Sequence, residues 1–342
     1  MSDARTPKSL PHVVTVDFAR GLLAASVMAY HYLHMEGIAH VERVAYYAVY
    51  GFFVISGFAL YLRYQGDLKT AQDLRKYLAR RLFRIAPLFY CAIILHLLLV
   101  GPEAAQVYKV IWSASLLFGF ANAGDSSLLM GGWSIGIEMV FYLLLPFVVW
   151  TLTSRASIAA ATAAALVLSV AFVNFTLRGQ QAFDAPLWSA YTQPAAFLGY
   201  FMAGILIAAI FVASPRKGRF WPPALMVAAL VPFVLIDAAH PIDLLVGWRG
   251  IVLIGATIAF VVGAVYLVEP TGLARTIARA IGALSYPIYL LHPLAYLAVG
   301  KLGIVAAWPR LLAATCLTVL VSMVVMRWIE TPARAFGRRA FP

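Results

Sequence analysis

Residues 16–34 decide the fold, and they read Val16-Asp17-Phe18-Ala19-Arg20-Gly21-Leu22-Leu23-Ala24-Ala25-Ser26-Val27-Met28-Ala29-Tyr30-His31-Tyr32-Leu33-His34. The stretch is apolar enough to enter a bilayer, yet it carries four ionisable side chains. Each of these costs roughly 2.5–3.5 kcal/mol at membrane depth, so such residues are seldom without a role. On an α-helix, Asp17, Arg20, Ala24, His31 and His34 form one polar stripe. We therefore expect a membrane helix whose stripe faces the interior of a bundle. The alternative is that Asp17 and Arg20 form a structural pair and His31 only packs.

The composition extends this expectation to the whole chain. Of its 342 residues, 63% are hydrophobic and only 12% are charged, whereas a soluble protein has about 25% charged residues. Segments of about 20 apolar residues are long enough to cross the hydrocarbon. Ten such segments predict an all-α polytopic membrane protein with one bundle of about ten helices. They are residues 13–34, 44–63, 83–100, 133–151, 156–175, 193–213, 220–237, 249–268, 284–300 and 309–329.

The distribution of basic residues predicts the orientation. Most of the 26 Lys and Arg residues fall in alternate extramembrane segments, chiefly between residues 63 and 84 and after residue 327. Cytoplasmic segments carry this excess, so both termini are expected in the cytoplasm, with short tails at about 1–12 and 331–342. This distribution of Lys and Arg is typical of a membrane protein. We therefore do not expect nucleic acid as a partner. No segment is long enough for a second domain, so residues 1–342 are expected to form one.

Three basic residues lie where the third segment enters the membrane: Arg80, Arg81 and Arg84. Arg81 and Arg84 are one helical turn apart, and guanidinium groups bind phosphate oxygens through two parallel hydrogen bonds. This spacing favours a phosphate-bearing ligand. Anchoring of the inner loop to anionic lipid is the alternative interpretation.

Two later segments carry further candidate residues. Ser134, Glu138 and Tyr142 are spaced by four and share a helix face, so Glu138 should meet Arg20, Arg84 or His31 across the bundle, either in a site or in a structural ion pair. Tyr289 and His292 lie one turn apart between two prolines. Taken alone, His292 has the sequence context of a packed core histidine.

Gly51 and Gly57 are expected to allow close helix packing. Cys91 and Cys316 do not have metal-ligand spacing, and no metal motif occurs.

Six motifs in order identify a resemblance that covers essentially the whole chain. They are Arg20 with His31 eleven residues later, Phe53-Val54-Ile55-Ser56-Gly57-Phe58, Arg80-Arg81-Leu82-Phe83-Arg84-Ile85-Ala86-Pro87, Trp133-Ser134 with Glu138-Met139-Val140-Phe141-Tyr142, Ser285-Tyr286-Pro287-Ile288-Tyr289-Leu290-Leu291-His292, and Glu330-Thr331-Pro332. The chain resembles the acyltransferase-3 family of bacterial inner-membrane O-acyltransferases, in the form without an SGNH hydrolase domain.

The resemblance implies an acyl-CoA donor, usually acetyl-CoA, and a hydroxyl of a cell-surface or exported glycan as acceptor. It implies that His31 and Arg20 are an essential pair and that Arg81 and Arg84, with Arg80 beside them, hold the coenzyme. It assigns no role to His34.

Transfer from a thioester to a hydroxyl needs a base, a positioned donor and stabilisation of an oxyanion, and no metal or bound redox cofactor. His31 is the expected base, with Asp17 or Glu138 as its carboxylate, and Arg20 is an alternative stabiliser of negative charge. Ser134, Tyr142, Tyr289 and His292 are expected to bind substrate. A proton-coupled exporter of a glycan or lipid-linked intermediate would use similar intramembrane groups, so this class stays open, as does a non-catalytic assembly subunit. Acyl length, acceptor identity and oligomeric state are also open.

Overall fold

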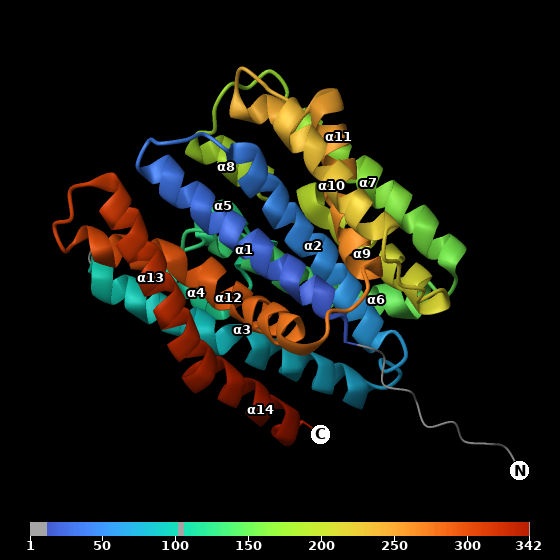
Figure 1. Ribbon diagram of the computed structural model, residues 1–342. Helices are drawn as coiled ribbons and strands as arrows, with labels where there is room; N and C mark the ends of the chain where they lie inside the picture. Colours follow the sequence, from blue (N-terminus) through green and yellow to red (C-terminus); the bar gives the residue numbers. More distant parts are fainter. Residues whose placement is uncertain (1–11, 102–105, 342) are drawn as a thin grey trace, which may run out of the picture.

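The computed structural model describes residues 12–101 and 106–341, and within these ranges the protein is a bundle of α-helices without named strands (Figure 1). Ten helices are long: α1 (Val14–Met35), α2 (Glu42–Tyr64), α3 (Ala71–Val100), α6 (Gly132–Thr151), α7 (Arg155–Leu177), α9 (Pro194–Ala213), α10 (Trp221–Leu235), α11 (Gly247–Tyr266), α12 (Gly272–Gly300) and α13 (Ala307–Val325). The shorter ones are α4 (Val107–Ser115), α5 (Ala123–Ser126), α8 (Ala185–Tyr191), α14 (Thr331–Ala340), the 3-10 turns η2 (Phe118–Phe120) and η3 (Pro241–Leu244), and the π-helical turn η4 (Met326–Glu330).

The prediction of an all-α polytopic membrane protein is confirmed. Each of the ten predicted segments corresponds to one of the ten long helices, and eight helices are long and apolar enough to cross a membrane. The other two are α1, which carries Asp17 and Arg20, and α10, which has 15 residues.

Some helices begin well before the apolar segment that predicted them. Helix α3 starts at Ala71, twelve residues before the predicted segment, because Thr70 and Asp73 form a capping box. The Asp73 amide donates to the Thr70 hydroxyl (3.2 Å) and the Thr70 amide donates to the Asp73 carboxylate (3.0 Å). Such reciprocal bonds satisfy amides that the first turn of a helix leaves free. The polar first turns of α3 therefore extend the helix beyond the apolar segment.

The predicted C-terminal tail contains helix α14, which packs on α3. The rings of Phe83 and Phe336 are 5.2 Å apart, Gly337 lies against Phe83, and Arg80 donates to the Phe341 carbonyl (3.3 Å). The absence of a side chain at Gly337 lets the two helices approach. Residues 1–11 of the predicted N-terminal tail lie outside the described residues.

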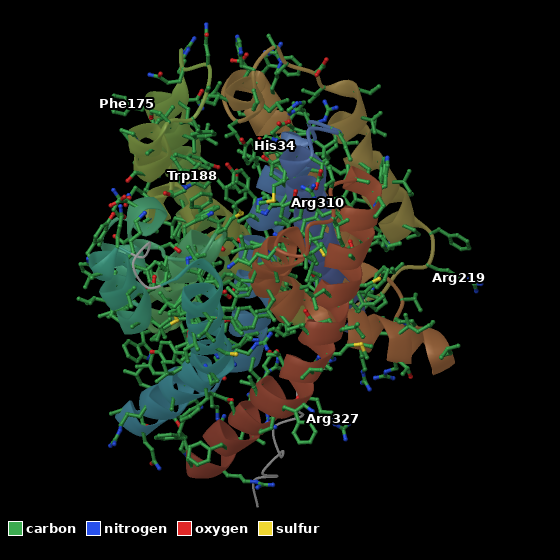
Figure 2. All side chains as sticks on the ribbon, turned by 90° about the vertical axis from the view of Figure 1, so that its left-hand side faces the viewer. His34, Phe175, Trp188, Arg219, Arg310 and Arg327 are labelled. Carbon is green, nitrogen blue, oxygen red and sulfur yellow. The ribbon has the colours of Figure 1, made fainter. Side chains whose placement is uncertain are left out.

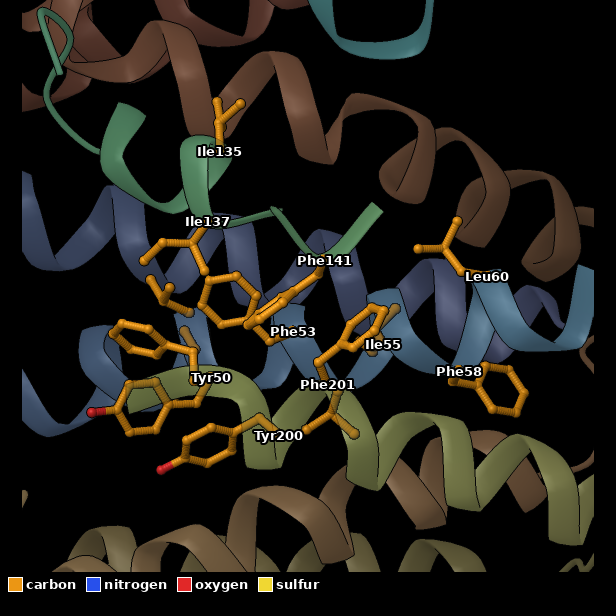
Figure 3. Close-up of a cluster of buried hydrophobic side chains, with 14 of the residues drawn as sticks. Tyr50, Phe53, Ile55, Phe58, Leu60, Ile135, Ile137, Phe141, Tyr200 and Phe201 are labelled. Atoms are coloured by element: carbon orange, nitrogen blue, oxygen red, sulfur yellow. The ribbon is translucent and has the colours of Figure 1, made fainter. Parts of the chain in front are cut away.

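Helices α2 and α9 form the tightest pair in the bundle. Gly57 of α2 faces the backbone of Phe201, and Gly204 of α9 faces the backbone of Val54, so a side chain at either glycine would collide with the opposite helix. Aromatic rings fill the space beside this contact: Phe53 lies edge-to-face with Phe141 at 5.5 Å, and Phe141 stacks on Phe201 at 4.8 Å (Figure 3). The predicted packing role of Gly57 is confirmed.

The two ends of the bundle are formed by different helices and turns. We call the end with α14 and the first turns of α1 and α3 the α14 end, and the opposite end, with the turn between α1 and α2, the α1–α2 end (Figure 1). Figure 2 shows Arg327 and His34 toward these opposite ends. Polar contacts join segments within each end: Lys217 pairs with Glu269 (3.1 Å) at the first, and Arg310 pairs with Glu36 (3.2 Å) at the second.

Candidate active site

Two neighbouring cavities occupy the interior of the bundle. The first, which we call the arginine cavity, has a volume of about 330 Å³ and is lined from α1, α2, α3, α6 and α12. Its polar lining consists of His12, Arg20, Ser56, Arg63, Tyr64, Arg81, Arg84, Ser134, Glu138, Tyr142, Ser285, Tyr286 and Tyr289. Four guanidinium groups around one cavity with a single carboxylate make a site suited to an anion.

The second cavity, which we call the aromatic cavity, has a volume of about 500 Å³ and lies toward the α1–α2 end. His31 and His34 line it together with a set of aromatic side chains, namely Tyr30, Tyr46, Tyr50, Trp133, Phe183, Trp188, Tyr191 and Tyr289. Val49 and Tyr289 line both cavities, so the two are adjacent. The polar stripe of α1 thus lines both cavities, with Arg20 in the arginine cavity and His31 in the aromatic cavity.

His31 has a histidine partner from the far end of the chain. Its Nδ1 lies 2.8 Å from Nε2 of His292, whose own Nδ1 lies 3.0 Å from the Ile288 carbonyl. A carbonyl only accepts, so a neutral His292 carries its proton on Nδ1 and accepts at Nε2. His31 must then donate from Nδ1, which leaves its Nε2 unprotonated. The contact therefore selects the tautomer of His31 that accepts a proton at Nε2.

His292 lies outside both cavities, unlike the other residues expected to bind substrate. It is 1% exposed and lines neither cavity, whereas Ser134, Tyr142 and Tyr289 line the arginine cavity. The Tyr289 hydroxyl is bonded to that of Ser134 (2.7 Å) and donates to the Gly131 carbonyl (3.1 Å), which fixes the ring between the two cavities. His292 is thus placed behind His31.

Glu138 faces the arginine cavity, but its hydrogen bonds are to hydroxyl groups. Ser56 (3.0 Å) and Tyr142 (2.7 Å) both donate to its carboxylate. Among the contacts of the described residues, neither Glu138 nor Asp17 bonds to His31. Asp17 instead pairs with His12 (3.0 Å), a residue that the sequence reasoning passed over, and this hydrogen bond raises the pKa of His12 above its ordinary value.

The three arginines of α3 have three different environments. Arg81 donates to the Tyr64 hydroxyl (3.3 Å) and lies over the rings of Tyr64 and Tyr142, and in the described part of the chain it has no carboxylate partner. Arg84 is paired with the buried Glu330. Arg80 does not line the arginine cavity; it lies toward α14 and bonds to the Phe341 carbonyl. Of the two α3 arginines that line the arginine cavity, Arg81 is therefore the one without a carboxylate partner in the described part of the chain.

Glu330 is the second residue whose role sequence reasoning missed. It is 1% exposed and pairs with both Arg84 and Arg334, which joins the end of α13 to α3. Its place in the Glu330-Thr331-Pro332 motif was the only signal in the sequence. A buried carboxylate at a helix end is an indication of a cationic partner, although it does not say which one.

Comparison with known families identifies a match over nearly the whole chain. The acyltransferase-3 family model, described as an acyltransferase domain, matches residues 13–327, from the first turn of α1 into the π-helical turn after α13. Both cavities are built from residues within this range, apart from His12. No curated protein and no solved structure matches the chain.

Proposed function

The chain belongs to the acyltransferase-3 family and is a membrane acyltransferase, and from that premise we propose that it transfers an acyl group from acyl-CoA to a hydroxyl of a cell-surface or exported glycan. We take acetyl as the group and acetyl-CoA as the donor. The proposed location is the bacterial inner membrane, with both termini and the α14 end in the cytoplasm. The observation that carries the proposal is the adjacency of a basic cavity and a cavity containing the oriented His31.

The arginine cavity is the proposed donor site. Arg81 and Arg20 line it without carboxylate partners among the described residues, so their charges are available to the phosphates of coenzyme A. Arg20 and His31 are eleven residues apart on one helix, which is about 16 Å along its axis. The pantetheine arm is long enough to extend from phosphates near the arginines, past Tyr289, to a thioester beside His31.

The aromatic cavity is the proposed acceptor site. Sugar rings present C–H groups that pack against aromatic faces, and their hydroxyls bond to nearby polar groups. Trp133, Trp188 and Phe183 supply such faces around His31, with ring centres 5.4 Å apart for the two tryptophans and 5.2 Å for Phe183 and Trp188. A few polar groups within a mainly aromatic lining are typical of sites for small organic ligands.

The proposed reaction begins with proton transfer from the acceptor hydroxyl to Nε2 of His31 while its oxygen attacks the thioester carbonyl. The resulting tetrahedral oxyanion collapses by breaking the carbon–sulfur bond. The CoA thiolate leaves and takes the proton back from His31. While His31 holds the proton, its Nδ1–H still donates to the neutral His292, which stabilises the imidazolium. No carboxylate is needed in this scheme.

The test is thioester cleavage by the purified protein in detergent, with acetyl-CoA and with glycan from a deletion strain as acceptor. His31→Gln should lower the rate about 10²–10⁴-fold, because glutamine does not take a proton at neutral pH. Acetyl-CoA binding should be unchanged. His96→Gln is the matched control, because His96 lies on α3 and lines neither cavity. Undiminished transfer by His31→Gln would refute the role of His31, and the absence of thioester cleavage by the parent protein would favour an exporter.

A further inference from the structure

Three potential metal ligands meet at the α1–α2 end, at the edge of the proposed acceptor site. They are His34 in the last turn of α1, His40 in the connecting turn and Glu42, the first residue of α2. One ligand atom from each lies within 4.8 Å of the other two. Figure 2 shows His34 at this end of the molecule.

The two distances to Glu42 are close to those between ligands of a tetrahedral metal ion. Nδ1 of His40 lies 3.1 Å from Oε1 of Glu42, and Nδ1 of His34 lies 3.7 Å from the same oxygen. Zinc binds histidine nitrogen and carboxylate oxygen at 2.0–2.2 Å, so two ligands of one tetrahedral ion are about 3.3 Å apart. Binding all three atoms to one ion requires the cluster to contract from separations of up to 4.8 Å.

The surroundings of Glu42 give a second, independent reason to expect a bound cation. The residue is 8% exposed, and its ion pairs in the described part of the chain are to His34 and His40 alone. In the described part of the chain, no Lys or Arg side chain pairs with this largely buried carboxylate. A buried carboxylate is stabilised by a positive charge beside it. A divalent cation would supply the missing charge.

Access and ligand chemistry narrow the choice of ion. The side chains of His34 and His40 are 48% and 71% exposed, so an ion can enter from solvent and keep a water as its fourth ligand. Two nitrogens and one oxygen suit zinc and disfavour magnesium and calcium, which prefer oxygen ligands.

We propose that His34, His40 and Glu42 form a binding site for a zinc-type divalent cation at the rim of the aromatic cavity. Its ligands come from the end of one helix, the turn and the start of the next, so the ion would hold the α1–α2 turn in place. His34 also lines the aromatic cavity, so the ion would fix one edge of that cavity. Zinc binding at this site does not depend on the proposed acyl transfer.

The test is zinc binding by the full-length protein, purified without a polyhistidine tag and measured by calorimetry and by metal analysis after gel filtration. We expect one zinc per chain and a higher melting temperature with zinc, because a ligand that binds the folded state stabilises it. Magnesium should give neither effect. His40→Ala, His34→Ala and Glu42→Gln should each weaken zinc binding at least about tenfold, since even outer-shell changes cost that much.

His240→Ala is the matched control, because His240 lies in another turn at the same end and is not part of the cluster. It should bind zinc like the parent protein. His40 is the most exposed of the three ligands, so His40→Ala is expected to fold, and its melting temperature without zinc checks this. Absence of zinc from the parent protein, or full retention by the folded His40→Ala protein, would overturn the proposal. Both readouts are independent of acyl transfer.

Discussion

At the scale of single residues, the His31–His292 contact orients the histidine that we propose as the base. His292 lies 261 positions from His31 in the sequence. Its unprotonated Nε2 accepts a hydrogen bond from Nδ1–H of His31. Removing His292 leaves the His31 ring free to rotate and to take the other tautomer. His292→Ala should therefore lower kcat about 10–100-fold, equivalent to about 1.4–2.7 kcal/mol in the activation barrier, with little change in the KM for acetyl-CoA.

A conservative variant distinguishes positioning from packing at the same place. His292→Gln keeps an amide oxygen that accepts from Nδ1–H of His31, so its kcat should exceed that of His292→Ala. Steady-state kinetics with acetyl-CoA as the varied substrate measures both parameters. Equal loss in the two variants, accompanied by a lower melting temperature, would mean that His292 only fills space.

At the scale of helices, buried charges join α3 to the end of α13. Glu330 is 1% exposed and pairs with Arg84, whose side chain is 14% exposed. Breaking a buried pair by removing one partner costs about 3–5 kcal/mol, because the remaining charge stays desolvated. Glu330→Gln should lower the free energy of unfolding in detergent by about that amount, as measured by denaturant titration.

The exposed pair of Arg63 and Asp67 is the control for this effect. Both of its side chains are more than half exposed, and such pairs contribute only about 0–1 kcal/mol. Asp67→Asn should therefore change the free energy of unfolding by less than about 1 kcal/mol. A Glu330→Gln protein as stable as the Asp67→Asn protein would show that Glu330 does not hold the helices together.

Local patterns explain why most helices were predicted, and contacts between distant segments explain what was missed. A run of apolar residues predicts a membrane helix wherever it occurs, which holds for α2, α9 and α13. Helix α14 was expected as a tail because its ten residues include three arginines and contain no such run. It is held by Phe83 and Arg80 of α3.

The same distinction applies to the candidate site. The stripe on α1 predicted that Arg20 and His31 would face the interior, because helical spacing alone determines which face they share. The partners of His31 and Arg84 come from α12 and η4, so only the packing of the bundle brings them together. The cluster of His34, His40 and Glu42 depends on the geometry of one turn, which hydrophobic periodicity does not predict.

At the scale of the whole molecule, the two cavities lie toward opposite ends, so the proposal requires the substrates to arrive from opposite sides of the membrane. Acyl-CoA carries phosphates and does not cross a bilayer unaided. In sealed vesicles, acetyl-CoA should be cleaved only when it is supplied on the side of the α14 end.

Cysteine labelling identifies that side. In a Cys91→Ala, Cys316→Ala background, a membrane-impermeant maleimide added to intact spheroplasts should label Asp125→Cys and Asp243→Cys but not Arg338→Cys on α14. Inverted vesicles should show the reverse, because Lys and Arg concentrate in segments that stay cytoplasmic. Labelling of Arg338→Cys from outside would invert the proposed topology. Cleavage of acetyl-CoA supplied at the α1–α2 end would contradict donor entry through the arginine cavity, even if the topology held.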